Sequence, residues 1–189
     1  MHIGLYFGSF NPIHVGHLII ASYARQYTQL QQVWLVVSPQ NPLKHSNTLL
    51  NEYHRLHLVN IAIQDDPQLR ATDIEFKLPK PSYTIDTLTY LQEKYPMHSF
   101  SVIMGSDSLH NLPAWKNYET LLDNYHLYVF ERPGFKIVQY PNATIHKMEA
   151  PLLQISSTLI RQMIQQGKSI RYLVPPAVQQ EIELNNYYK

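Results

Sequence analysis

Hydrophobic runs alternate with amphipathic stretches along most of the chain, and this alternation predicts strands and helices in turn. The first two runs cover residues 3–7 and 33–37, and the second is continuously apolar. A continuous apolar run is typical of a strand that is covered on both faces in a parallel sheet. Between the two runs, Val15, Leu18 and Ile19 recur near helical spacing. The chain is therefore expected to begin as strand, turn, helix and strand.

The same alternation continues beyond residue 37. Further strands are expected over Leu69 to Phe76, Phe100 to Met104, Leu127 to Phe130 and Ala143 to Met148. Two further helices are expected to begin at polar caps. One follows Asn51, and the other follows Ser82 or Thr84 and extends to Tyr95. Three more helices are expected over Tyr118 to Asn124, Ser156 to Gln166 and Pro176 to Tyr188. This order predicts an α/β fold, namely a Rossmann-like doubly wound parallel sheet with helices on both faces and a small helical C-terminal end. Since no linker or repeat divides the chain, residues 1–189 are expected to form a single domain.

Composition narrows the chemistry that such a fold can carry. The chain has 189 residues, no Cys, and 15 Lys and Arg against 14 Asp and Glu. The absence of Cys excludes disulfides, thiolate nucleophiles and Cys-based metal sites. The near-neutral balance gives no electrostatic reason to bind nucleic acid. No stretch is long enough to span a membrane, and the N-terminus has no signal segment, so we expect a soluble cytoplasmic protein.

The most informative motif is residues 8–17, GSFNPIHVGH, directly after the first strand. Gly8 allows a tight turn, and His14 and His17 lie three residues apart, on one helix face beside the positive end of the helix dipole. Two imidazoles and free backbone amides suit a phosphoryl group. An ordinary turn with surface histidines stays an alternative, and a zinc pair is a poorer one because no third ligand lies near in the sequence.

Other polar segments follow later strands or start helices, and each also has an ordinary structural interpretation. In residues 155–161, ISSTLIR, hydroxyls at a helix start and Arg161 can hold an anion, although Ser and Thr are also common caps. Residues 105–108, GSDS, can contact a ribose or form only a turn. Trp115 can stack on a flat ring or anchor a loop.

Together these segments resemble a known family. His14-Val15-Gly16-His17 with residues 155–161 is similar to the HxGH nucleotidyltransferase superfamily. More narrowly, the chain resembles bacterial nicotinate-nucleotide adenylyltransferases through SYTIDTL at 82–88, MGSD at 104–107, Trp115, RPG at 132–134 and YLVP at 172–175. The resemblance spans essentially the whole chain in order. Phe7 is one departure, since many relatives have a Gly there.

The resemblance implies a reaction and a set of site residues. The reaction is transfer of AMP from ATP to nicotinic acid mononucleotide in NAD synthesis, with pyrophosphate released. The implied catalytic residues are His14, His17 and Arg161. The implied ATP-binding residues are Gly8, Ser9, Phe10, Gly16, Gly105, Asp107, Ser156, Ser157 and Thr158. The implied mononucleotide contacts are Lys44, Thr84, Trp115 and Arg132.

The resemblance also bears on the metal and on rival functions. Mg²⁺ is expected to be carried mainly by the ATP phosphates and water, which fits the lack of a carboxylate cluster in the sequence. Pantetheine-phosphate adenylyltransferase and a nicotinamide mononucleotide enzyme are rivals in the same class, and Trp115 and residues 84–88 argue against both. A non-catalytic nucleotide sensor is the rival in a different class, and it would need neither the His pair nor Arg161. The sequence leaves the oligomeric state open.

Overall fold

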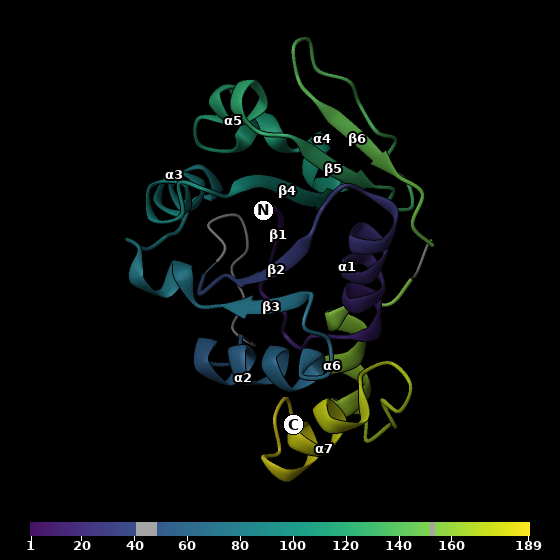
Figure 1. The fold of residues 1–189 in the computed structure, drawn as a ribbon. Coiled ribbons are helices and arrows are strands. Elements are labelled where there is room, and N and C mark those ends of the chain that lie inside the picture. Colours follow the sequence, from purple (N-terminus) through teal and green to yellow (C-terminus); the bar gives the residue numbers. More distant parts are fainter. Residues whose placement is uncertain (41–48, 152–153) are drawn as a thin grey trace.

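The structure, a computed structural model, describes residues 1–40, 49–151 and 154–189. Within these ranges it forms a six-stranded sheet with the order β3-β2-β1-β4-β5-β6, in which every neighbouring pair is parallel (Figure 1). The strands are β1 (His2–Gly8), β2 (Gln32–Val37), β3 (Leu69–Thr72), β4 (Ser99–Gly105), β5 (Leu127–Phe130) and β6 (Ile145–Met148). The strand order reverses between β1 and β4, and doubly wound sheets bind ligands beyond the carboxyl ends of the strands at such a point.

Helices cover both faces of this sheet (Figure 1). They are α1 (Val15–Tyr27), α2 (Glu52–Ile63), α3 (Thr84–Lys94), α4 (Ser106–His110), α5 (Tyr118–Asn124), α6 (Ser157–Gln165) and α7 (Pro176–Leu184), with short 3₁₀ helices η1 (Ile74–Lys77) and η2 (Leu112–Ala114). Within the described ranges, none of these helices has the length and apolarity that a bilayer crossing requires.

Two hydrophobic cores lie on opposite faces of the sheet because successive strand side chains alternate. In β2, Val33 and Leu35 join a core with buried residues of α1, α2, α6 and α7. Trp34 and Val36 join the other core, with buried residues of α3, α4 and α5. The prediction of a doubly wound α/β fold with a helical C-terminal end is confirmed.

Two local predictions near β3 were wrong, namely the end of that strand and the cap of α3, and Glu75 explains the error in the cap. The strand predicted to reach Phe76 ends at Thr72 and is followed by η1, which buries the Glu75 side chain. The cap of α3 was predicted to be Ser82 or Thr84, but the Ser82 hydroxyl donates to Glu75 Oε2 at 2.8 Å and Thr84 is the first residue of the helix. The N-cap is Tyr83, which makes no side-chain capping bond. By contrast, Asn51 caps α2 as predicted, since its side-chain oxygen accepts the Tyr53 N–H at 2.9 Å.

Candidate active site

A cleft of about 590 Å³ opens where the chain leaves β1 and β4, and its walls come from segments far apart in the sequence. Its volume is within the range usual for small-molecule sites. The cleft is lined by most of the residues that the sequence singled out, namely Gly8, Ser9, Phe10, His14, His17, Thr84, Gly105, Asp107, Trp115, Arg132, Ser156, Ser157, Thr158 and Arg161. Lys44 lies outside the described residues. The fold therefore brings the β1–α1 loop, the start of α3, the end of β4 and the start of α6 to one place.

Gly16 is the described candidate that does not line the cleft. It is buried in the first turn of α1. A Cβ atom at this position would stand 3.0 Å from His14 Nδ1, closer than side chains usually approach. Gly16 thus lets the His14 ring lie directly against the helix. Its observed role is to make room for this ring.

His14 and His17 form a stacked pair at the amino end of α1. Their ring centroids lie 3.6 Å apart with an interplanar angle of 22°. The backbone N–H of His14 donates to His17 Nδ1 at 3.3 Å. Because Nδ1 accepts, the proton of a neutral His17 ring lies on Nε2, and this tautomer makes Nε2–H a donor. Phe10 packs edge-on against the same ring at 5.0 Å and supports its orientation.

His14 is almost entirely buried. Burial, with a smaller contribution from the positive charge of Arg132, lowers the pKa of His14 to about 4. The His14 ring is therefore neutral near pH 7 and can act as a hydrogen-bond donor without carrying a charge.

The start of α6 is tied to the β1–α1 loop. Arg161 Nη1 donates to the Asn11 carbonyl at 2.8 Å, and the Ser157 hydroxyl donates to the Pro12 carbonyl at 2.9 Å. Ser156 caps the helix by accepting the Leu159 N–H at 3.2 Å. The Arg161 and Ser157 bonds join residues 150 and 145 positions apart in the sequence. They place a guanidinium and a helix amino end beside the His pair, an arrangement that favours anions.

Asp107, in α4 directly after β4, lies beside a cation that follows β5. Arg132 Nε lies 3.9 Å from Asp107 Oδ1, and the guanidinium lies over the Phe130 ring at 5.1 Å from its centroid. Gly105 leaves room for both, since a Cβ atom there would stand 3.0 Å from Arg132 Cγ. This part of the cleft therefore offers a carboxylate and a guanidinium side by side.

The opposite wall combines the start of α3 with half-buried Trp115, which follows η2. Thr84 is the first residue of α3. The N-cap residue, Tyr83, makes no side-chain hydrogen bond to the amides of the first turn. Lys116 binds Asp86 at 2.8 Å and lies over the Tyr83 ring at 5.0 Å. The wall thus presents an indole, a hydroxyl and a helix amino end, groups suited to a flat ring that bears an anionic substituent.

Sequence reasoning missed two buried charged residues at the cleft, Glu75 in its lining and Arg55 behind it. Arg55 in α2 is fully buried, and Glu75 in η1 is 2% exposed. Desolvation raises the pKa of Glu75, although the hydroxyls of Ser82 and Thr87 donate to its carboxylate. A signal for Arg55 was present, because it lies three and four residues before apolar Leu58 and Val59, on the same helix face.

The described residues contain no group of three or more His, Asp or Glu placed to hold a metal ion. A divalent cation in this cleft would therefore need most of its ligands from a bound phosphate compound and from water, the usual arrangement for Mg²⁺ with nucleotides.

Comparison with known proteins agrees with this geometry. Residues 5–163 match the cytidylyltransferase-like family. A protein from Flavobacterium psychrophilum is 52% identical over 100% of both chains, and one from Cytophaga hutchinsonii is 52% identical over 100% of this chain and 98% of its own. Both carry the description probable nicotinate-nucleotide adenylyltransferase.

The fold is also shared with a solved structure. This is the nicotinic acid mononucleotide adenylyltransferase of Plasmodium falciparum complexed with NaAD, with a TM-score of 0.84 at 23% identity. The alignment covers 99% of this chain and 97% of that one. Because the relatives that are 52% identical match this chain over its full length, the chain belongs to the nicotinate-nucleotide adenylyltransferase family within the cytidylyltransferase-like proteins.

Proposed function

We propose that the cleft aligns ATP with nicotinic acid mononucleotide so that AMP is transferred directly between them. A phosphate oxygen of the mononucleotide forms a bond to the α-phosphorus of ATP, and the bond from that phosphorus to the β-bridging oxygen breaks. The products are nicotinic acid adenine dinucleotide and pyrophosphate. The observation that carries this proposal is the stacked His14–His17 pair at the amino end of α1, in one cleft with Arg161.

The attacking group needs no general base. A phosphate monoester has a second pKa of about 6, so it is mostly a dianion near neutral pH. The chain must instead bring two anions together and stabilise the charge that develops on the α-phosphate and the leaving pyrophosphate. Neutral, oriented N–H donors and a fixed guanidinium are suited to that task.

The phosphate half of the site is assigned to the β1–α1 loop, α1 and α6. His17 Nε2–H would donate to the α-phosphate, with the His14 ring stacked behind it. Arg161 and the hydroxyls at the start of α6 would hold the β- and γ-phosphates. Gly105 and Asp107 would contact the adenosine. Mg²⁺, when bound with ATP, would neutralise part of the phosphate charge, held by phosphate oxygens and water.

The mononucleotide half is assigned to the wall formed by α3 and Trp115. The indole would stack on the pyridine ring, and Thr84 with the first-turn amides of α3 would bind its carboxylate. Arg132 and Lys44 would contact the mononucleotide's anionic groups. The proposal treats residues 1–189 as one nucleotidyltransferase domain, because both cores share one sheet. A cytoplasmic location stays a prediction.

The acceptor test measures pyrophosphate release from ATP with nicotinate or nicotinamide mononucleotide supplied separately. We expect kcat/KM to favour the nicotinate form by more than tenfold, about 1.4 kcal/mol or more. Donors arranged for a carboxylate are poorly matched by an amide, whose NH₂ group would face them. Equal kcat/KM for the two acceptors would contradict the assigned carboxylate site, and no release with either would contradict the proposed reaction.

Replacing Trp115 with Ala should weaken use of the mononucleotide and leave the KM for ATP nearly unchanged. Loss of stacking on the ring should cost about 1–3 kcal/mol, by analogy with bases on aromatic side chains. Tyr90→Ala is a matched control, because Tyr90 is a half-buried aromatic packed against the same core but does not line the cleft. If Trp115→Ala changes thermal stability as Tyr90→Ala does and leaves the mononucleotide KM unaltered, Trp115 is an anchor of its loop.

A further inference from the structure

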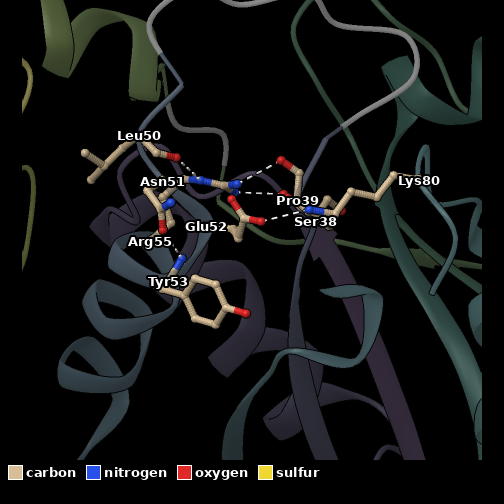
Figure 2. A network of polar contacts seen from close by, with 8 residues as sticks. All are labelled: Ser38, Pro39, Leu50, Asn51, Glu52, Tyr53, Arg55 and Lys80. Carbon is tan, nitrogen blue, oxygen red and sulfur yellow. Dashed lines mark hydrogen bonds and ion pairs between the residues drawn. The ribbon is translucent and has the colours of Figure 1, made fainter. Parts of the chain in front are cut away.

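Arg55 is a fully buried cation that the reaction as assigned above does not use. Its guanidinium donates to four backbone carbonyls, those of Leu50 at 2.8 Å, Ser9 at 2.5 Å, Ser38 at 2.8 Å and Pro39 at 3.0 Å. Figure 2 shows three of these bonds, and it shows the neighbouring acid, Glu52, bound to Lys80. Among the described residues Arg55 forms no ion pair, so carbonyl dipoles are what compensate its charge.

The four carbonyls belong to three segments, and Arg55 contacts all of them. Ser9 follows β1, Ser38 and Pro39 follow β2, and Leu50 precedes α2. Two further bonds join the same segments, since the Ser38 N–H donates to the Gly8 carbonyl at 2.9 Å and the Leu50 N–H donates to Asn11 Oδ1 at 3.1 Å. The guanidinium is thus a common anchor for the loops after β1 and β2, both of which line the cleft.

The β1–α1 loop needs such an anchor because it contains a strained residue. Phe10 has a φ of 45°, in the left-handed region that bulky side chains rarely adopt. The carbonyls on its two sides are both held by guanidiniums, Ser9 by Arg55 and Asn11 by Arg161. In a planar trans peptide the C=O and N–H point in opposite directions. With its carbonyl directed at Arg55, the Ser9–Phe10 peptide therefore directs its N–H away from α2.

We propose that Arg55 is a positioning residue for adenylyl transfer. It lies behind the cleft and outside its lining. It fixes the loop that carries the His pair relative to the loop after β2, and so sets the alignment of the two substrates. The inference rests on the proposed function. Alignment contributes strongly to rate, and a displacement of about 1 Å can cost about 100-fold.

A purely structural role for Arg55 makes a different kinetic prediction. Loss of folded protein lowers the amount of active enzyme, whereas misaligned loops lower the rate at which each folded molecule reacts. A single-turnover measurement with enzyme in excess separates these effects. At saturating enzyme its rate constant reports the chemistry of the folded molecules, and a thermal melt of the same sample reports how much of the protein is folded.

The test uses Arg55→Lys and Arg55→Met in the full chain. Lys keeps the charge but cannot reach four carbonyls in one plane, and Met keeps much of the volume without burying an unpaired charge. With ATP and nicotinic acid mononucleotide, we expect the single-turnover rate constant to fall by about 10- to 100-fold in Arg55→Lys and at least as far in Arg55→Met. The dissociation constant of ATP should change by a smaller factor than the rate constant.

Leu58→Ala is the matched control, because Leu58 is buried in the same helix and contacts the core behind α2. It should lower the melting temperature and leave the rate constant within twofold of wild type. A wild-type rate constant in either Arg55 variant, with or without a lower folded fraction in the melt, would overturn the positioning role. A change in ATP affinity as large as the change in rate would also overturn it, since that indicates ground-state binding. An inactive wild type would overturn the proposed function instead.

Discussion

Replacing His17 with Ala should lower kcat by about 10²–10³-fold, or about 2.7–4 kcal/mol, and should shift the dissociation constant of ATP far less. The reason is the tautomer. His17 Nδ1 accepts the His14 backbone N–H, so a neutral ring presents Nε2–H as its donor. A donor directed at the α-phosphate gains strength as negative charge develops there, so its contribution is larger in the transition state than in bound ATP.

Single-turnover transfer and direct ATP binding on the purified variant measure this difference, with a thermal melt for folding. His57→Ala is a suitable control, because His57 is exposed on α2 and pairs with Glu181 away from the cleft. It should keep the kcat of the wild type. Wild-type turnover in folded His17→Ala would remove His17 from the catalytic residues. A wild type that binds ATP but never transfers AMP would support the sensor hypothesis.

Replacing Arg161 with Ala should reduce kcat/KM for ATP by about 10- to 150-fold, mostly through a higher KM. The substitution removes the proposed bond to the distal phosphates and the observed bond to the Asn11 carbonyl. A hydrogen bond to a charged group typically contributes about 1.5–3 kcal/mol. Arg161→Lys should lie between wild type and Ala, because it keeps the charge and loses the planar two-point geometry.

The comparison is made by steady-state kinetics with each substrate varied in turn. The KM for the mononucleotide should stay nearly constant. Arg171→Ala serves as control, because Arg171 is also in the C-terminal part of the chain but is exposed and outside the cleft. Unchanged kinetics in Arg161→Ala would assign its guanidinium to a structural tie between α6 and the β1–α1 loop.

The fold followed from features that are local in sequence. The four inner strands, β2, β1, β4 and β5, contain short apolar runs, and helical periodicity lies between them, so the alternation was sufficient to predict a doubly wound sheet. The cleft followed from the general placement of ligands at the carboxyl ends of such strands. The predicted residues from the β1–α1 loop, the end of β4 and the start of α6 do line one cleft.

The partners of the buried charges could not be predicted from the sequence, because these partners are distant residues or backbone atoms. In α2 the predicted apolar positions were Leu56, Val59, Ile61 and Ile63, of which Val59 and Ile63 are buried and the other two are partly buried. Arg55, on the buried face, is satisfied by carbonyls that no residue-type pattern reveals. Glu75 likewise took the Ser82 hydroxyl that looked like a cap. The Ser82 hydroxyl binds Glu75 rather than the helix amides because a buried carboxylate is costly unless it accepts hydrogen bonds.

The two faces of the sheet also have a consequence for how such an enzyme can diverge. The proposed phosphate contacts on α1 and α6 belong to elements packed on one core, and Thr84 and Trp115 belong to elements packed on the other. Substitutions distant from each other and without shared partners are usually additive in energy. A lineage can therefore exchange its acceptor by changing α3 and the segment around η2, while the contacts to the ATP phosphates on α1 and α6 are inherited intact.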